Sequence, residues 1–134
     1  METLENMGKM KRVCDGRHKV DYPACTIGRN GFNFYCYLNA IARRHFDPAE
    51  QGVNWYVNED DRRHVNYIIA MPSTAVNAYK PIIKQRGGIY TGYSFPKSLV
   101  DEGKVNPGMY KLYRYKSGFA FKPYEPIKEE DIDG

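Results

Sequence analysis

The amino-acid sequence predicts a mostly β fold made of two interleaved repeats, each containing one short helix. Apolar residues alternate with polar ones in several short segments, which is the two-residue period of strands. Turn-forming pairs such as Asn30-Gly31 and Ser117-Gly118 separate these segments. The same order of strand, helix and hairpin occurs twice along the 134 residues. A chain of this length suits one domain with a modest core.

The first half of the chain predicts a hairpin or bent strand, then a short helix, then a second hairpin. Apolar residues alternate at Cys25, Ile27, Phe32, Phe34, Cys36 and Leu38, with a turn expected at residues 28–31. Helix formers occupy residues 39–46, where the Asn39 side chain is able to cap the helix. Strands are then expected at residues 53–57 and 65–70, with a charged turn at residues 58–63.

The second half repeats this plan with a shorter final hairpin. Extended segments are expected at residues 79–83 and 89–95, and Pro96 opens a helix over residues 96–102. The turn Asn106-Pro107-Gly108 then leads into strands at residues 109–115 and 119–121.

The positions of matching residues indicate a duplication. An offset of 57 aligns Tyr22 with Tyr79 and Arg29 with Arg86, and it drops to 51 at the C-terminal end. Insertions confined to turns are typical of real repeats, although two strand-rich halves also align by chance because turn residues recur. We expect a flexible basic arm (residues 1–20), a first repeat (21–72), a link (73–78), a second repeat (79–124) and a solvated acidic tail (125–134).

Charge is distributed unevenly along the chain. Residues 21–124 carry fourteen Lys or Arg against eight Asp or Glu, whereas residues 125–134 carry five acids and one lysine. A basic body favours an anionic partner, most commonly nucleic acid. The alternative is that the surplus lysines only keep the domain soluble.

The sequence also predicts the compartment. No stretch of about 18 apolar residues exists, so we expect no membrane-spanning segment. The first eleven residues lack the apolar centre of a signal peptide. Cys14, Cys25 and Cys36 match neither a disulfide framework nor a metal knuckle, so we interpret them as free thiols, with Cys25 and Cys36 packed in strands. A cytoplasmic protein is expected.

Three segments of the second half resemble a known family. They are Phe-Pro-Lys-Ser-Leu at residues 95–99, Val-Asn-Pro-Gly-Met-Tyr-Lys-Leu-Tyr at 105–113, and Ser-Gly-Phe-Ala-Phe-Lys-Pro at 117–123. Together they resemble the swapped-hairpin AbrB-type domain of bacterial transition-state regulators and MazE-like antitoxins. The resemblance implies a small barrel in which two copies interleave their hairpins. Such domains are usually homodimers, but here both copies lie in one chain, and a homodimer of the chain stays open.

The same resemblance implies double-stranded DNA as the partner. By position, the implied DNA-binding residues are Arg29, Arg43, Arg44, Lys84, Arg86 and Lys97. Three departures from the family pattern argue against a protein whose two halves contact DNA equivalently. Asn39 replaces a proline, and Asp101-Glu102 ends the second helix where basic residues are expected. The family's Gly-Arg just before the apolar-Pro pair is missing in both repeats, since Gly31 and Gly88 lie further upstream. Adjacent arginines at a helix end also favour the helix macrodipole, which is an alternative reason for Arg43 and Arg44.

Tyrosine is abundant, with twelve copies. This number is compatible with three roles: a platform on which bases of single-stranded nucleic acid stack, a protein-binding face, or tyrosines that cover a small core. The tyrosines considered for such a platform are Tyr90, Tyr93, Tyr110, Tyr113, Tyr115 and Tyr124.

No catalytic motif is apparent. The three histidines have no metal-ligand spacing, and Gly87-Gly88 lacks the context of a phosphate-binding loop. We therefore expect no metal, no cofactor and no enzymatic activity. The first hypothesis is a bacterial or phage DNA-binding transcription regulator of AbrB type. The alternative is an antitoxin-like or phage-encoded inhibitor that binds a host or toxin protein.

Overall fold

The structure, a computed structural model, describes residues 20–46, 52–83 and 90–128, and its strands confirm the mostly β prediction. The first half contains β1 (Ala24–Asn30), β2 (Asn33–Leu38), α1 (Ala40–His45), β3 (Gly52–Glu59) and β4 (Val65–Ser73). The second half contains β5 (Pro81–Ile83), β6 (Tyr90–Phe95), α2 (Lys97–Asp101), β7 (Gly108–Lys111), β8 (Tyr113–Tyr115) and β9 (Gly118–Phe121).

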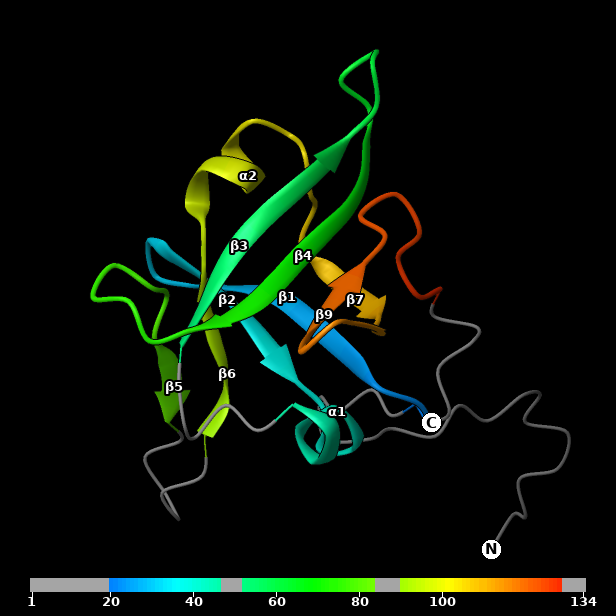
Figure 1. Ribbon diagram of the computed structural model, residues 1–134. Coiled ribbons are helices and arrows are strands. Elements are labelled where there is room, and N and C mark those ends of the chain that lie inside the picture. Colours follow the sequence, from blue (N-terminus) through cyan, green and yellow to red (C-terminus); the bar gives the residue numbers. More distant parts are fainter. Residues whose placement is uncertain (1–19, 47–51, 84–89, 129–134) are drawn as a thin grey trace, which may run out of the picture.

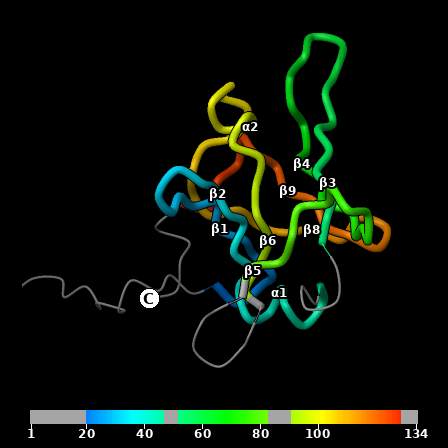
Figure 2. Tube along the Cα trace, turned by 90° about the vertical axis from the view of Figure 1, so that its left-hand side faces the viewer, coloured from blue at the N-terminus to red at the C-terminus, as the bar shows by residue number. Residues whose placement is uncertain are grey.

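These strands form two antiparallel sheets that face each other across the core (Figures 1 and 2). One sheet has the order β5-β6-β2-β1-β7, and the other has the order β3-β4-β9-β8. Each half of the chain contributes strands to both sheets. Strand β2 pairs with β6, β1 with β7, and β4 with β9, so the halves are joined by main-chain ladders.

The expected small barrel is wrong in one respect: the described strands form two sheets, joined by a single bridge between Val53 and Tyr79, and do not close into a barrel. The segment expected as one strand at residues 109–115 divides at Leu112 into β7 and β8. The Leu112 N–H donates to the Pro23 carbonyl oxygen beside β1 (2.9 Å), and the chain then crosses to the other sheet. Strands β5, β7, β3 and β8 are consequently sheet edges.

Element boundaries differ from the predicted ones mainly at turns. Strand β1 continues to Asn30, so it includes most of the segment expected as a turn at residues 28–31. The observed turn consists of the two residues between Asn30 and Asn33. Strand β4 continues to Ser73, beyond the expected end at residue 70, so its ladder with β3 is longer than predicted. Residues after β9 also stay attached, since the Ile127 N–H donates to the Met109 carbonyl oxygen (2.7 Å).

The core between the sheets is an aromatic cluster centred on Phe119. Its ring centroid lies 5.2 Å from Phe46, 5.9 Å from Trp55 and 6.2 Å from Tyr93. Trp55 also packs edge-on against Phe95 at 4.8 Å. Each buried aromatic or aliphatic side chain of this kind contributes about 1.5–3 kcal/mol to folding. The cluster therefore holds the two sheets together.

The two helices lie at opposite ends of the molecule (Figure 2). This follows from the ladder between β2 and β6, because β2 leads into α1, β6 leads into α2, and the two strands are antiparallel. The β1–β2 turn is thus placed at the α2 end. Strand β2 spans six residues, so the two ends are separated by roughly 20 Å at about 3.3 Å per residue.

Candidate nucleic-acid interface

Helix α1 is positioned by Asn39, as its sequence predicts. The Asn39 Oδ1 accepts a hydrogen bond from the Ala42 N–H (2.8 Å), which is the expected N-cap. The same oxygen accepts from the Ala24 N–H (3.2 Å), and Asn39 Nδ2 donates to the Tyr22 carbonyl oxygen (2.9 Å). One side chain therefore both starts the helix and anchors it to the beginning of β1.

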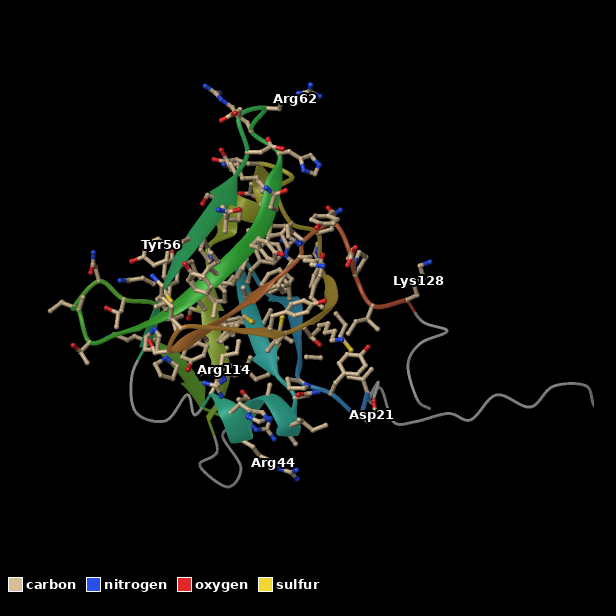
Figure 3. The ribbon with its side chains drawn as sticks, turned by 45° about the vertical axis from the view of Figure 1, so that its right-hand side comes forward. Asp21, Arg44, Tyr56, Arg62, Arg114 and Lys128 are labelled. Carbon is tan, nitrogen blue, oxygen red and sulfur yellow. The ribbon has the colours of Figure 1, made fainter. Side chains whose placement is uncertain are left out.

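The last turn of α1 carries Arg43, Arg44 and His45. Arg43 is half-buried, and its Nη1 donates to the Leu38 carbonyl oxygen (2.9 Å), so part of its hydrogen-bonding capacity is already used. Arg44 and His45 are exposed. Figure 3 shows Arg44 projecting away from the molecule at this end. Arg44 therefore offers the freer guanidinium, while Arg43 offers a partly fixed one.

Arg114 joins this end of the molecule from the other half of the chain. Its guanidinium carbon lies 5.2 Å from the centroid of the Phe46 ring, directly after α1. In the view of Figure 3, Arg114 lies above α1 and Asp21 lies to the right of the helix. We call Arg43, Arg44 and Arg114 the α1-end arginines. The sequence reasoning missed Arg114, although one signal was available: residues 103–124 contain five Lys or Arg and no acid.

Arg29 and Lys97 both lie at the opposite end of the molecule. Strand pairing joins Phe34 to Phe95, which brings the β1–β2 turn next to the start of α2. Arg29 is exposed, and its Nε donates to the Gly31 carbonyl oxygen (2.7 Å). Lys97 Nζ lies 3.8 Å from a carboxylate oxygen of Asp101. The structure thus divides the described candidates between two ends, and Lys84 and Arg86 lie outside the described residues.

Acidic residues offset the positive charge at the α2 end. Lys104 Nζ lies 3.1 Å from Glu59 and 3.5 Å from Glu102. The hydrogen bond and charge of Glu59 raise the pKa of Lys104, with a smaller contribution from Glu102. By contrast, α1 has no acid in its first turn and three bases in its last. The described residues at the α1 end are therefore the more favourable ones for an anion.

The tyrosines considered from the sequence separate into two groups. Tyr93 and Tyr110 are buried, with 4% and 1% of their surface exposed, so they belong to the core. Burial raises the pKa of the Tyr110 hydroxyl, which donates to the Asn106 carbonyl oxygen. Tyr113, Tyr115 and Tyr124 are exposed, whereas the side chain of Tyr90 lies outside the described residues.

The two described cysteines are thiols buried within strands, which confirms the sequence prediction for Cys25 and Cys36. Burial raises the pKa of the Cys36 thiol, and its hydrogen bond with Cys25 raises it further. Cys14 lies outside the described residues. Among the residues that the structure describes, no group of three or more His, Cys, Asp or Glu side chains is arranged to hold a metal ion.

Comparison with known proteins adds nothing to this description: no family model, no curated protein and no solved structure matches the chain. In the part of the chain that the structure covers, no helix is long and apolar enough to cross a bilayer.

Proposed function

We propose that this chain is a non-catalytic DNA-binding regulator of AbrB type that contacts duplex DNA through its α1 end. The observation that carries the proposal is the convergence of the α1-end arginines from two distant parts of the chain. Arginine is well suited to phosphate because its planar guanidinium forms two parallel hydrogen bonds. Arg44 is exposed for this role, and Arg43 and Arg114 are held by protein contacts.

The strand pairing supports the swapped-hairpin part of the proposal. In the β2–β6 ladder, Cys36 faces Tyr93, and 93 minus 36 is 57, the offset of the sequence repeat. In the β4–β9 ladder, Ile69 faces Ala120, and 120 minus 69 is 51, the offset near the C-terminal end. Each ladder therefore contains one pair of equivalent residues facing each other, which is the position where a local two-fold axis between interleaved repeats would cross an antiparallel ladder.

The exchange of hairpins between repeats has support from two further contacts. Strand β7 of the second half pairs with β1 of the first. In the reverse direction, Val53 at the start of β3 exchanges two main-chain hydrogen bonds with Tyr79 ahead of β5 (2.9 and 2.8 Å). The first contact is a full ladder and the second a single bridge, so the two repeats are related only approximately.

This asymmetry suggests a one-sided DNA contact. With the offset of 57, the α2 end places Asp101 where α1 places Arg44, and Glu102 where α1 places His45. Lys97 is paired with Asp101. Two such acids repel phosphates at the α2 end. We therefore propose that one end of the molecule binds the duplex and the other supports the fold.

The test is a fluorescence-anisotropy titration of the full chain with random-sequence duplex DNA across a salt series. Each phosphate contact contributes about 0.9 to the slope of log affinity against log salt. We expect Arg43→Ala/Arg44→Ala to weaken binding and to reduce this slope by roughly 1.8. The matched control is Arg62→Ala/Arg63→Ala, which removes the same charge from the exposed β3–β4 tip. Absence of duplex binding at low salt, or equal losses in the two variants, contradicts the proposal.

A second candidate function, binding of a host or toxin protein, is favoured by one observation. Phe32 at the β1–β2 turn is 81% exposed, so its ring is available to a protein partner, and aromatic side chains are enriched at protein–protein interfaces. If the chain binds no DNA and a stoichiometric protein partner is lost on Phe32→Ser, this second function replaces the first.

A further inference from the structure

The outer face of the four-stranded sheet carries a group of tyrosines that the α1-end proposal does not use. Strand residues alternate between faces. Trp55, Ile68 and Phe119 point into the core. Tyr56 and Tyr67, next to Trp55 and Ile68 in the sequence, therefore point outward, with exposed fractions of 50% and 37%. Tyr113 and Tyr115 lie on either side of Arg114, which pairs with Phe119, and also point outward, with exposed fractions of 37% and 41%. We call these four residues the tyrosine face, and Figure 3 shows Tyr56 directed away from the core.

Main-chain pairing places this face in a regular geometry. One row across the sheet runs Tyr56, Ile69, Ala120, Tyr113, with a tyrosine at each end and the small Ala120 near its middle. At about 4.8 Å between strands, the two tyrosine backbones lie roughly 14 Å apart. Tyr113 and Tyr115 are two residues apart on β8, hence roughly 6.8 Å apart on the same face. The aromatic rings therefore border a shallow surface.

Cations accompany the same tyrosines. The Nζ atoms of Lys111 and Lys122 lie 5.6 and 5.3 Å from the Tyr113 ring centroid, and Lys116 Nζ lies 5.4 Å from that of Tyr115. Glu125 lies 3.8 Å from Lys122 and partly balances it. Three ammonium groups against one carboxylate leave this edge positively charged.

The four strands themselves provide almost no opposing charge. Their only acidic residue is Glu59, at the end of β3. Glu59 is paired with Lys104, beside α2, and faces Val65, which packs against the core. No acid therefore lies on the outward positions of the described strands.

We propose that the tyrosine face binds single-stranded nucleic acid, with bases stacked on Tyr56, Tyr113 and Tyr115 and phosphates held by the neighbouring lysines. An open four-stranded sheet with exposed aromatic residues suits unpaired bases, whose faces are free to stack on aromatic rings. Bases inside a duplex are stacked on each other and do not reach such a surface. The lysines set the preference for a polyanion over a protein partner.

The tyrosine face and the α1 end share strand β8, where Arg114 lies between Tyr113 and Tyr115 but faces Phe119 and Phe46 on the other side of the sheet. Arg43 and Arg44, which lie on α1, therefore separate the two proposals. The measurement is anisotropy of fluorescein-labelled oligo-dT and oligo-U of about 12 nucleotides, within the size range of such sites. The two oligonucleotides distinguish DNA from RNA as the source of the single strand. Stacking on one aromatic side chain corresponds to roughly 5- to 140-fold in affinity.

We expect Tyr56→Ala and Tyr113→Ala each to weaken single-strand binding within that range. Tyr56→Phe and Tyr113→Phe are expected to keep affinity within about threefold, because a phenyl ring retains the stacking surface. Tyr79→Ala is the matched control, since Tyr79 is 37% exposed but lies opposite the inward Val53. Thermal melts monitored by circular dichroism establish that each variant is folded.

Three results overturn the proposal. The first is no binding of either oligonucleotide at low salt, and the second is equal affinity of the Tyr56→Ala, Tyr79→Ala and unmodified chains. The third is loss of single-strand binding in Arg43→Ala/Arg44→Ala to the same extent as duplex binding, which assigns both to the α1 end. Retention of single-strand binding in that variant, with loss in the tyrosine variants, supports the tyrosine face whatever the duplex result.

Discussion

Substitution of Gly92 by alanine is a direct test of the ladder that joins the two halves of the chain. Gly92 lies in β6 opposite Tyr37, and a Cβ added there overlaps the carbonyl oxygen of Cys36. That oxygen belongs to the backbone of β2, so no side-chain rotation relieves the overlap. Strands β2 and β6 must therefore separate locally.

The size of the effect follows from this displacement. Forcing an extra methyl group into a packed interior costs about 1–3 kcal/mol. Weakening one or two ladder hydrogen bonds adds about 0.5–1.5 kcal/mol each. We expect Gly92→Ala to lower the free energy of unfolding by roughly 2–4 kcal/mol, a large fraction of the 5–15 kcal/mol typical of a domain.

The assay is urea unfolding followed by the fluorescence of Trp55, the single tryptophan. Its indole N–H donates to the Ser94 carbonyl oxygen in β6 (3.0 Å), so its emission reports this contact. With a slope of about 2 kcal/mol per molar urea, a typical value for a small domain, the midpoint is expected to fall by roughly 1–2 M.

The matched control is Gly28→Ala, in β1. A Cβ there meets only the Tyr37 ring, at 3.5 Å, which is ordinary van der Waals contact. We expect its midpoint to stay unchanged or to rise slightly, because alanine restricts the unfolded chain. Equal midpoints for Gly92→Ala and Gly28→Ala would refute the β2–β6 ladder in this register.

Two further predictions concern the cap of α1 and two buried titratable groups, the Cys36 thiol and the Tyr110 hydroxyl. Asn39→Ala removes the cap and leaves the Ala24 N–H without its partner. We expect this variant to lose about 1–3 kcal/mol of the free energy of unfolding, measured in urea. Asn39→Asp keeps the accepting oxygen, so we expect it to lose less. Burial raises the pKa values of Cys36 and Tyr110 in the folded state, so their protonated forms stabilise it fully below the unfolded-state values of about 9 and 10. Stability is expected to fall as pH rises above about 9, and a free energy of unfolding that stays constant from pH 8 to 11 contradicts this.

Local features of the chain were predictable because they depend on neighbouring residues. The alternation of Phe34, Cys36 and Leu38 predicts β2, and the amide of Asn39 predicts the N-cap that the structure shows. Phe32, also expected in this alternation, lies instead in the turn before β2 and is exposed. Pro96 likewise precedes α2 as expected. Arg43 and Arg44 were assigned to a helix end on the same local grounds, and both lie there.

Features that depend on strand partners were not predictable from local sequence. Tyr93, Tyr110 and Tyr113 look alike in the sequence, yet two are core residues and one lies on an exposed edge strand. The difference arises because a strand has two faces, and only the packing of the sheets decides which face is covered. The division of the expected strand at residues 109–115 at Leu112 has the same origin, and so does the arrangement of the described strands in two sheets.

The sequence alone determined the class of fold, the order of its elements and the basic character of the body, since these follow from composition and from periods of a few residues. The tertiary structure alone decided which charges meet. It separated Arg29 and Lys97 from the α1-end arginines by the length of a strand, and it brought Arg114 to Phe46 from 68 positions further along the chain, since 114 minus 46 is 68. Contacts over such separations depend on how the two sheets register and pack.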